Sequence, residues 1–341
     1  MLEIDGGSGG GQIVRTALAL SMVTETPVRL TDIRGSRPTP GLRPQHLAGV
    51  RVAERVSDAT VSGAEVGATE LTFSPDTVSG GDYQIDIGTA GSITLLFETL
   101  LPLATVLDDP LSLSATGGTD VKWSPTMAYY ERVKLPLLAR YGLDAEGRLH
   151  RSGFYPAGGG RATLRLRPTS LSTLDLTDRG PLERVVVHSK ASTSLENKSV
   201  ATRQADAATE RLSDQNLTYS VEEPAYVPAT SPGSALLLEA RYRESLAGFD
   251  ALGEPGKSSE AVAEEAFEAF EAFERTAAAV DDHLADQLLV FLALGGGRVR
   301  IPRLTAHVRT NRTVVEAFGG GLTCTESPDG TVLVEVDDRI D

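Results

Sequence analysis

A weak internal repeat constrains the fold more than any other feature of this 341-residue sequence. In three places a helix-like apolar segment is followed by a short strand and then by a polar loop. Such units, packed about one centre, would bring their loops together. The sequence therefore predicts an α/β protein of three repeated βα-type units, helices plus four-stranded sheets, with one site built from distant segments. The predicted helices cover 12–23, 92–106 and 283–294, the strands cover 27–33, 110–115 and 299–301, and the loops begin at Arg34, at Thr116 and around His307.

Residues 180–275 differ in character and are predicted to form a small inserted α/β domain. Phenylalanines recur on one face of the last helix in this stretch, which places them in a core. Serines at its start can cap it. Residues 1–179 and 276–341 are predicted to form the catalytic domain. Within the insert we expect strands over 182–188 and 235–242 and helices over 197–216 and 258–279, with Phe267, Phe270 and Phe273 buried and Ser258 and Ser259 as caps.

The charge balance is strongly acidic and poor in lysine. The chain has 47 Asp and Glu against 32 Lys and Arg, a net charge of −15, and five lysines. Carboxylate-rich surfaces hold hydration at high salt, so we favour a salt-adapted organism over an ordinary acidic protein. The net charge argues against general affinity for nucleic acid. Residues 1–55 are an exception, with seven arginines against five acidic residues, and suit a phosphorylated chain end.

The sequence predicts a cytoplasmic protein. No stretch approaches the ~20 apolar residues that span a bilayer, and the N-terminus lacks the layout of a signal peptide. The single Cys324 excludes an internal disulfide and a multi-cysteine zinc site. Apolar strand edges could pair subunits, so a homodimer stays open.

Two segments offer groups that bind phosphate. The glycine-rich stretch 6–11, interrupted by Ser8, precedes a helix, so its N–H groups can approach a phosphate closely. A structural tight turn is the alternative. Arg15 lies one turn into that helix, and Arg34 and Arg37 lie in a loop stiffened by prolines, which reduces the entropy lost on clamping a phosphate. A surface salt bridge is the alternative for each arginine.

His307 is the candidate nucleophile. A neutral imidazole among phosphate-binding groups can attack phosphorus, so these segments together suggest nucleotidyl transfer. The residues alone leave open a different enzyme of the repeated-unit type, such as an enolpyruvyl transferase, in which arginines bind phosphate without a covalent histidine.

A series of glycine-rich and polar motifs lies in order over nearly the whole chain. The motifs are Gly9-Gly-Gly-Gln-Ile-Val-Arg15, Arg34-x-x-Arg-x-x-Pro-Gly-Leu42 with Gln45-His46, Gly80-Gly-Asp-Tyr83, Gly88-x-Ala-Gly-Ser92, Gly117-Gly-Thr-Asp120, Gly153-Phe-Tyr-Pro-Ala-Gly-Gly-Gly160, Leu284-Ala-Asp-Gln287 and His307-x-x-Thr-Asn311. Together they resemble the motifs of the RNA 3′-terminal phosphate cyclase family, archaeal type. Only residues 180–275 resemble the family by their position in the chain more than by their amino acids.

The resemblance implies three nucleotidyl-transfer steps. A histidine, here His307, attacks the α-phosphorus of ATP and releases pyrophosphate. AMP then moves to an RNA 3′-phosphate, and the adjacent 2′-hydroxyl displaces AMP to give a 2′,3′-cyclic phosphate. An imidazole, with a reference pKa of ~6.5, is largely neutral at pH 7, and a phosphoramidate is a good AMP donor. A non-catalytic RNA-binding relative that acts in ribosome assembly is the alternative, and the presence of His307 argues against it.

The resemblance also implies ATP and a divalent metal, Mg or Mn, as cofactors, and RNA 3′-phosphate ends as the partner. The residues it assigns to ATP are Gly9, Gly10, Gly11, Gln12, Pro125, His283, Leu284, Asp286 and Gln287. Those assigned to the RNA phosphate are Arg15, Arg34, Arg37 and Gln45, and those assigned to the metal are Glu98 and Asp286.

Three positions depart from the family's pattern. Ser8 stands where the family usually has a glutamate that is thought to bind the metal, and Glu98 stands where the family often has a glutamine. We infer that Glu98 takes the metal role, with a solvated helix residue as the alternative. His283 stands where a tyrosine would flank adenine, and an imidazole presents less apolar area for stacking.

Overall fold

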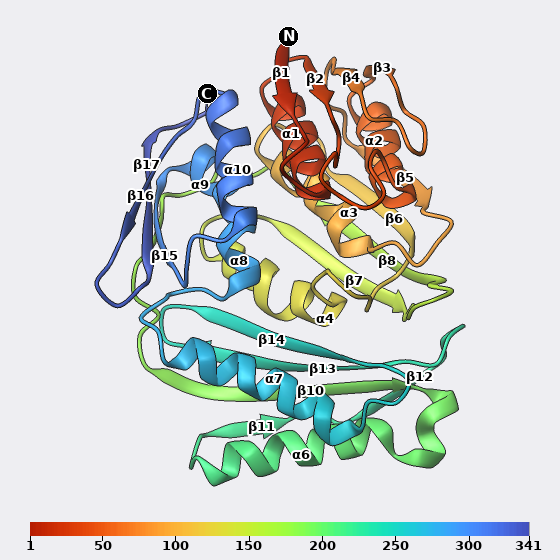
Figure 1. The fold of residues 1–341 in the computed structure, drawn as a ribbon, viewed down its shortest axis with the longest axis vertical. Helices are drawn as coiled ribbons and strands as arrows, with labels where there is room; N and C mark the ends of the chain where they lie inside the picture. The colour runs from red at the N-terminus through yellow and green to blue at the C-terminus, as the bar shows by residue number, and fades with distance from the viewer. Residues whose placement is uncertain (341) are drawn as a thin grey trace.

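The computed structural model describes residues 1–340 of the chain (Figure 1). Within this range three four-stranded sheets repeat one pattern, in which the strands lie in the order first, second, fourth, third. In each sheet the first two strands are parallel and the others antiparallel. The predicted fold of three repeated units with four-stranded sheets is confirmed. Each unit runs βαβαββ, so the helix-then-strand pattern of the sequence is only its middle part.

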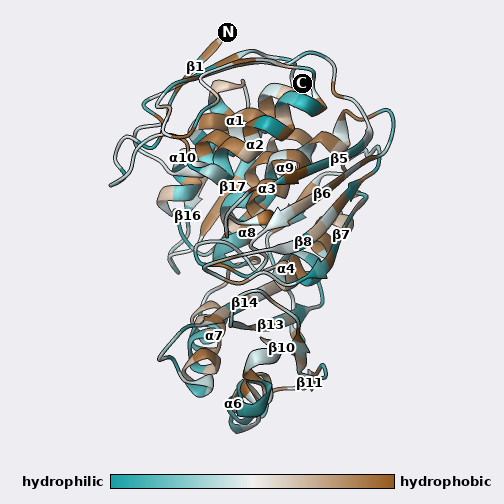
Figure 2. Cartoon of the chain, turned by 90° about the vertical axis from the view of Figure 1, so that its right-hand side faces the viewer, coloured by the Kyte–Doolittle hydropathy of each residue, from teal (hydrophilic) through white to brown (hydrophobic). Residues whose placement is uncertain are grey.

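The helices of the three units meet at the centre of the molecule, where α1 contacts α2, α3 and α10, and the sheets lie outside them (Figures 1 and 2). The first unit contains β1 (Leu2–Asp5), α1 (Gly11–Val23), β2 (Val28–Thr31), α2 (Pro44–Val56), β3 (Thr60–Ser62) and β4 (Leu71–Ser74). The second contains β5 (Gly81–Asp86), α3 (Ile93–Leu100), β6 (Leu111–Gly117), α4 (Met127–Tyr129), α5 (Leu135–Ala139), β7 (Ala145–Arg151) and β8 (Gly160–Leu166). The third contains β9 (Leu174–Leu176), α8 (Asp282–Gln287), α9 (Leu289–Gly295), β15 (Gly297–Ile301), α10 (Ala306–Ala317), β16 (Gly321–Glu326) and β17 (Val332–Asp338).

Within the three repeated units, two predicted helices and one predicted loop were wrong in part. The helix expected over 92–106 ends at Leu100 and continues as a 3₁₀ turn, because Pro102 lacks an N–H and disrupts the α-helical pattern. The helix expected over 283–294 is divided into α8 and α9 at Leu288. His307 lies in the first turn of α10 rather than in a loop, because the hydroxyl of Thr305 caps this helix and accepts a hydrogen bond from Val308 N.

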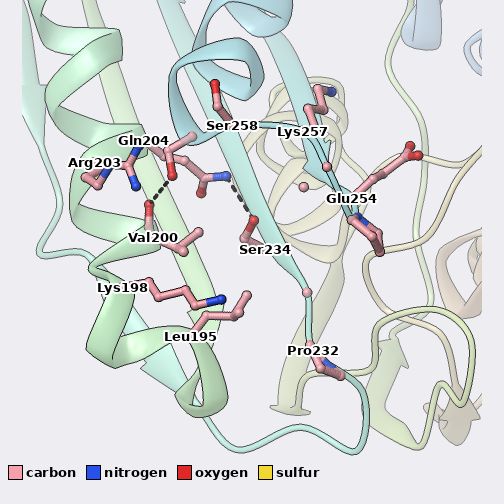
Figure 3. Close-up of a pocket in the computed structure, with 15 residues that line it drawn as sticks. Leu195, Lys198, Val200, Arg203, Gln204, Pro232, Ser234, Glu254, Lys257 and Ser258 are labelled. Atoms are coloured by element: carbon pink, nitrogen blue, oxygen red, sulfur yellow. Dashed lines mark hydrogen bonds between the residues drawn. The ribbon is translucent and has the colours of Figure 1, made fainter.

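The insert lies between β9 and α8 and has a hydrophobic cluster of its own, which includes the three predicted phenylalanines. Ser258 caps α7 as expected, but the helix ends at Glu274, where Arg275 and Thr276 begin a turn. Buried Gln204 joins α6 to the sheet by donating to Ser234 Oγ at 2.9 Å (Figure 3). The elements are β10 (Leu182–Ser192), α6 (Val200–Asp214), β11 (Tyr219–Val221), β12 (Ala225–Val227), β13 (Ser234–Tyr242), β14 (Leu246–Gly253) and α7 (Ser259–Glu274).

The strands β11, β12 and β14 of the insert were not predicted. The first two have three residues each, too few for an alternating pattern to be recognised. Strand β14 is buried along both faces over most of its length, so alternation is absent there. Within residues 1–340 no helix combines the length and the apolar character that a membrane crossing requires.

Candidate active site

Helix α1, which follows the glycine-rich loop, is joined to α10 by side-chain hydrogen bonds, and α10 is joined to α8 in the same way. Gln12 Nε2 donates to Thr310 Oγ1 at 3.0 Å, and Thr16 Oγ1 donates to Asn311 Oδ1 at 2.9 Å. The amide of Asn311 in turn donates to the main-chain oxygen and to Oδ2 of Asp286, at 3.2 and 3.3 Å. Helix α1 therefore lies beside α8 and α10, two predicted segments that follow it by almost 300 residues in the sequence.

His307 projects from this junction with 55% of its side chain exposed. Its Nδ1 lies 3.9 Å from Asp286 Oδ2, and no residue within 1–340 forms a hydrogen bond with its Nε2. Burial raises the pKa of Asp286, whereas the charges of His307 and Arg15 oppose that shift. The carboxylate therefore faces one ring nitrogen and leaves the other free for chemistry.

The glycines at the start of α1 allow two basic side chains to approach the helix. A Cβ at Gly10 would lie 3.3 Å from Arg37 Nη2, and one at Gly11 would lie 2.2 Å from His46 Nε2. Burial and the neighbouring charge of Arg15 lower the pKa of His46 to about 3, so this imidazole is neutral at pH 7. The first turn of α1 thus combines free N–H groups with a nearby guanidinium, which suits an anion.

The predicted phosphate-binding residues differ in their contacts. Arg34 donates through Nη1 to the carbonyls of Thr39 and Gly41, at 2.7 and 3.0 Å, so it stabilises its own loop. Exposed Arg37 and half-buried Arg15 have no hydrogen-bond acceptor within residues 1–340, and burial lowers the pKa of Arg15. Their guanidinium groups stay available for phosphate.

Gln45, in the first turn of α2, connects this helix of the first unit to the second unit. Its Oε1 accepts a hydrogen bond from Ser92 N at 3.2 Å, and Ser92 caps α3 by accepting from Leu95 N. The side-chain oxygen of Gln45 is therefore occupied, while its amide nitrogen has no acceptor within residues 1–340.

Glu98 lines a small cavity with Gln12, Arg15, Asp286 and Gln287. Its Oε2 forms an ion pair with Lys134, a fully buried lysine that also donates to Gln287 Oε1 at 2.9 Å. The alternative interpretation of Glu98 as a solvated helix residue is therefore wrong.

Two carboxylate oxygens in this cavity have no hydrogen bond within residues 1–340, namely Glu98 Oε1 and Asp286 Oδ1. Within residues 1–340, no three His, Cys, Asp or Glu side chains are placed to hold a metal ion together. A divalent ion here would thus need ligands from a bound phosphate as well, which is how magnesium is usually held in sites of this type.

The residues predicted to flank adenine lie around Asp250 of the insert. Asp250 Oδ2 accepts from Thr126 N at 2.7 Å, directly after buried Pro125, and Asp250 Oδ1 lies 3.5 Å from His283 Nε2. Burial alone would lower the pKa of His283, but the hydrogen bond and charge of Asp250 raise it to about 9. The imidazole also packs edge-on against Tyr129, with ring centres 5.3 Å apart. It is therefore a cation at neutral pH and not an uncharged stacking ring.

Leu284 was predicted to bind ATP, but it lies in the core and not beside the other residues predicted for ATP. Its side chain is fully buried in the main core, and its N–H donates to Asp281 Oδ1 at 3.0 Å. A direct contact with a nucleotide would require α8 to move.

Comparison with known proteins identifies the family. A family model described as RNA 3′-terminal phosphate cyclase matches residues 6–322. The chain belongs to the RNA 3′-terminal phosphate cyclase family. It is 43% identical over 345 residues to a protein of Halobacterium salinarum named RNA 3′-terminal phosphate cyclase, covering 98% of this chain and 99% of that one. Proteins of the same name from Pyrococcus furiosus and Caldivirga maquilingensis are 41% and 43% identical, covering 94% and 93% of this chain and 94% and 92% of their own lengths.

The RNA 3′-terminal phosphate cyclase family was the one predicted from the motifs, and its match disfavours the enolpyruvyl transferase alternative. Several residues of the cyclase site were nevertheless missed. Asp281 caps α8 and joins it to Tyr129 OH and to Gly248 N, at 2.7 and 2.9 Å. An acidic residue directly before a helix is a recognised capping signal, so Asp281 could have been found. Lys134 carried no comparable local signal.

Proposed function

We propose that this chain converts the 3′-terminal phosphate of RNA to a 2′,3′-cyclic phosphodiester, and that ATP supplies AMP through a covalent intermediate on His307. The family supports the overall reaction. The observation that carries the mechanism is the position of His307, exposed at the start of α10, with Nδ1 toward Asp286 and Nε2 free.

In the first step Nε2 of His307 attacks the α-phosphorus of ATP, and the bond from that phosphorus to pyrophosphate breaks. The ring then carries a positive charge, which the carboxylate of Asp286 stabilises from the Nδ1 side. AMP next passes from the imidazole to an oxygen of the RNA 3′-phosphate. The 2′-hydroxyl finally attacks that phosphate, loses its proton and releases AMP.

The anionic groups of the substrates fit the basic side of the site. The first turn of α1 and Arg37 beside Gly10 form a positive, donor-rich surface, and Arg15 faces the neighbouring cavity with Asp286. We assign Arg37 to the RNA 3′-phosphate and the region around the cavity to the triphosphate, so Arg15, predicted for the RNA phosphate, would contact ATP instead. Asp250 contacts both His283 and Thr126, the residue after Pro125, so Pro125 and His283 lie in one region and would flank the base.

The residues present fit a divalent metal in a limited way. Glu98 and Asp286 each keep one oxygen without a hydrogen bond in the same cavity, and hard oxygen donors are the ligands that Mg and Mn prefer. Such an ion, once bound, would neutralise charge on the triphosphate. Lys134 already neutralises part of the charge of Glu98, so Asp286 is the better-placed ligand.

Incubation with α-labelled ATP tests this proposal. We expect the label to remain on the protein as an adduct that acid destroys and base does not, as for a phosphoramidate. Addition of a 3′-phosphorylated RNA should then release the label as AMP and leave a cyclic end. A non-catalytic relative would bind RNA without acquiring label, and that result would contradict the proposal.

Arg37→Ala is expected to slow AMP transfer to RNA by on the order of tenfold to a hundredfold, because a charge-assisted contact with phosphate contributes roughly 1.5–3 kcal/mol. Formation of enzyme–AMP should change less. Arg34→Ala should show the same order of effects, together with a lower melting temperature, because Arg34 also holds the carbonyls of Thr39 and Gly41. Single-turnover assays of the two half-reactions measure this.

Arg298→Ala provides the matched control, because Arg298 is exposed on β15 and pairs with Asp175. If Arg37→Ala slows both half-reactions equally, the guanidinium belongs to the ATP site and our assignment is wrong.

A further inference from the structure

The outer face of β7 and β8 carries a cluster of arginines. Side chains of β8 alternate between core and solvent, and Arg161 and Arg165 point outward, as Arg148 and His150 do from β7. His150 Nε2 and Thr163 Oγ1, 2.8 Å apart, connect the two strands in the middle of this face. The sheet lies on the flank of the molecule beside the insert (Figures 1 and 2).

No carboxylate within residues 1–340 forms an ion pair with these arginines. Arg148, Arg161 and Arg165 form no ion pair and no side-chain hydrogen bond within residues 1–340, although the protein as a whole has a net charge of −15. Their exposed neighbour Arg167, in contrast, pairs with Asp144 at 2.7 Å. An unpaired group of like charges in an acidic protein disfavours the compact state unless it binds an anion.

Acidic residues define the limits of this cluster. Glu146 on β7 lies opposite Arg165 without bonding to it, and Asp82 and Asp86 extend from β5 at the far edge of the sheet. The strand between them and β8 is β6, which presents hydroxyl groups to solvent. The outward residues of β6 are Ser112, Ser114 and Thr116, opposite Arg165, Thr163 and Arg161. Arginine and hydroxyl side chains together are typical of surfaces that contact phosphate and sugar.

An open groove of about 690 Å³ begins at the end of these strands. Its walls include Thr116, Arg151 and Arg161 on one side and Val227 and Pro228 of the insert on the other. Arg151 Nη2 donates to Thr230 Oγ1 at 2.9 Å, so the insert is held against the sheet here.

The groove opens beside the loops that contact Gln45. Gly158, next to the groove, packs against the main chain of Ala90, and Gly118 N donates to Gly91 O. The following residue, Ser92, donates to Gln45. A strand that leaves the groove at this end would therefore meet the segment next to the predicted RNA-phosphate residues.

We propose that the arginine face of β7 and β8, with its groove, binds the backbone of single-stranded RNA upstream of the 3′ end. This proposal rests on the proposed function, which requires the RNA end to reach His307. Exposed guanidinium groups that follow one another along a strand and into a groove, as Arg165 and Arg161 do, neutralise successive phosphates without reading sequence. The acidic remainder of the surface would repel RNA elsewhere and confine it to this path.

The double variant Arg161→Gln/Arg165→Gln tests the proposal. Fluorescence anisotropy would measure binding of 3′-phosphorylated RNAs of roughly three and roughly fifteen nucleotides, within and beyond the reach of the end site alone. We expect binding of the long RNA to weaken about tenfold, with a salt slope smaller by about 1.4 for two lost phosphate contacts, and binding of the short RNA to stay unchanged.

The double variant Arg203→Gln/Arg298→Gln is the matched control, since both side chains are exposed and pair with carboxylates on other elements. The proposal is wrong if the control weakens long RNA equally, or if the test variant affects both lengths alike or neither. Labelling with ATP alone should be normal in both variants. If the wild type takes no label, the proposed function fails, but length-dependent binding still decides the role of this face.

Discussion

Replacement of His307 with alanine is expected to abolish both enzyme–AMP formation and RNA cyclisation. Within residues 1–340, no other group at the junction of α1, α8 and α10 combines exposure with a free nucleophilic nitrogen. The fold should be retained, because His307 is exposed and surface substitutions usually change the free energy of unfolding by about 0.5 kcal/mol or less. Labelling with α-labelled ATP, a cyclisation assay and a thermal melt measure the three outcomes.

Thr313→Ala, an exposed change two turns further along the same helix, is the control and should keep full activity. In the wild type the label should map to the peptide that contains His307. Buried His46 is an unsuitable nucleophile, because its Nδ1 accepts a hydrogen bond from Arg43 N and its Nε2 faces Gly11. Label on another histidine, or near wild-type cyclisation by the alanine variant, would falsify the covalent assignment.

The fold was predictable where the pattern of apolar residues is local. The helices α1 and α7 and the strands β2 and β6 have long or strongly periodic segments, and their caps and turns follow known rules. The full βαβαββ repeat was not recognised, because β1, β3, β4 and β9 have only three or four residues and β7 is largely exposed. Strand β8 alternates regularly between buried and exposed residues and could have been found. Register and strand order depend on tertiary packing, which no local pattern encodes.

The site was only partly predictable, for a related reason. Motifs identified the residues that face a ligand, such as Gln12, Asp286 and His307, and the structure places these three together. The residues that pair with Glu98, Gln287 and His283 were missed because they come from distant segments. Lys134 lies 36 residues from Glu98 and 153 from Gln287, and Asp250 reaches His283 from the insert. Such pairings arise from the fold and leave no spacing signal.

Glu98→Gln is expected to lower the free energy of unfolding by roughly 3–5 kcal/mol, because the ammonium group of Lys134 would lose its counter-charge in a fully buried position. Burial already lowers the pKa of Lys134, and the charge of Glu98 opposes that shift. Lys134→Met should restore much of the loss in the double variant, since replacing both partners of a buried pair is often nearly neutral. Urea unfolding at one fixed salt concentration measures the free energy of unfolding of the wild type, the two single variants and the double variant, which together form a double-mutant cycle. Additive effects of the two substitutions would show that the pair contributes no coupling.

The same cycle separates stability from metal binding at Glu98. A metal titration of the Glu98→Gln variant alone would mix both effects, because the variant loses the ion pair as well as the ligand. The ion pair is absent both in Lys134→Met and in Glu98→Gln/Lys134→Met. If enzyme–AMP formation needs a higher metal concentration in the double variant than in Lys134→Met, the difference therefore reports the loss of the metal ligand alone. Addition of Ser8→Glu should then reduce that requirement, because Ser8 lies four residues before Gln12, which lines the same cavity. If Lys134→Met and Glu98→Gln/Lys134→Met need the same metal concentration, Glu98 serves only to neutralise the charge of Lys134. Asp286 then holds the ion together with the phosphates of ATP.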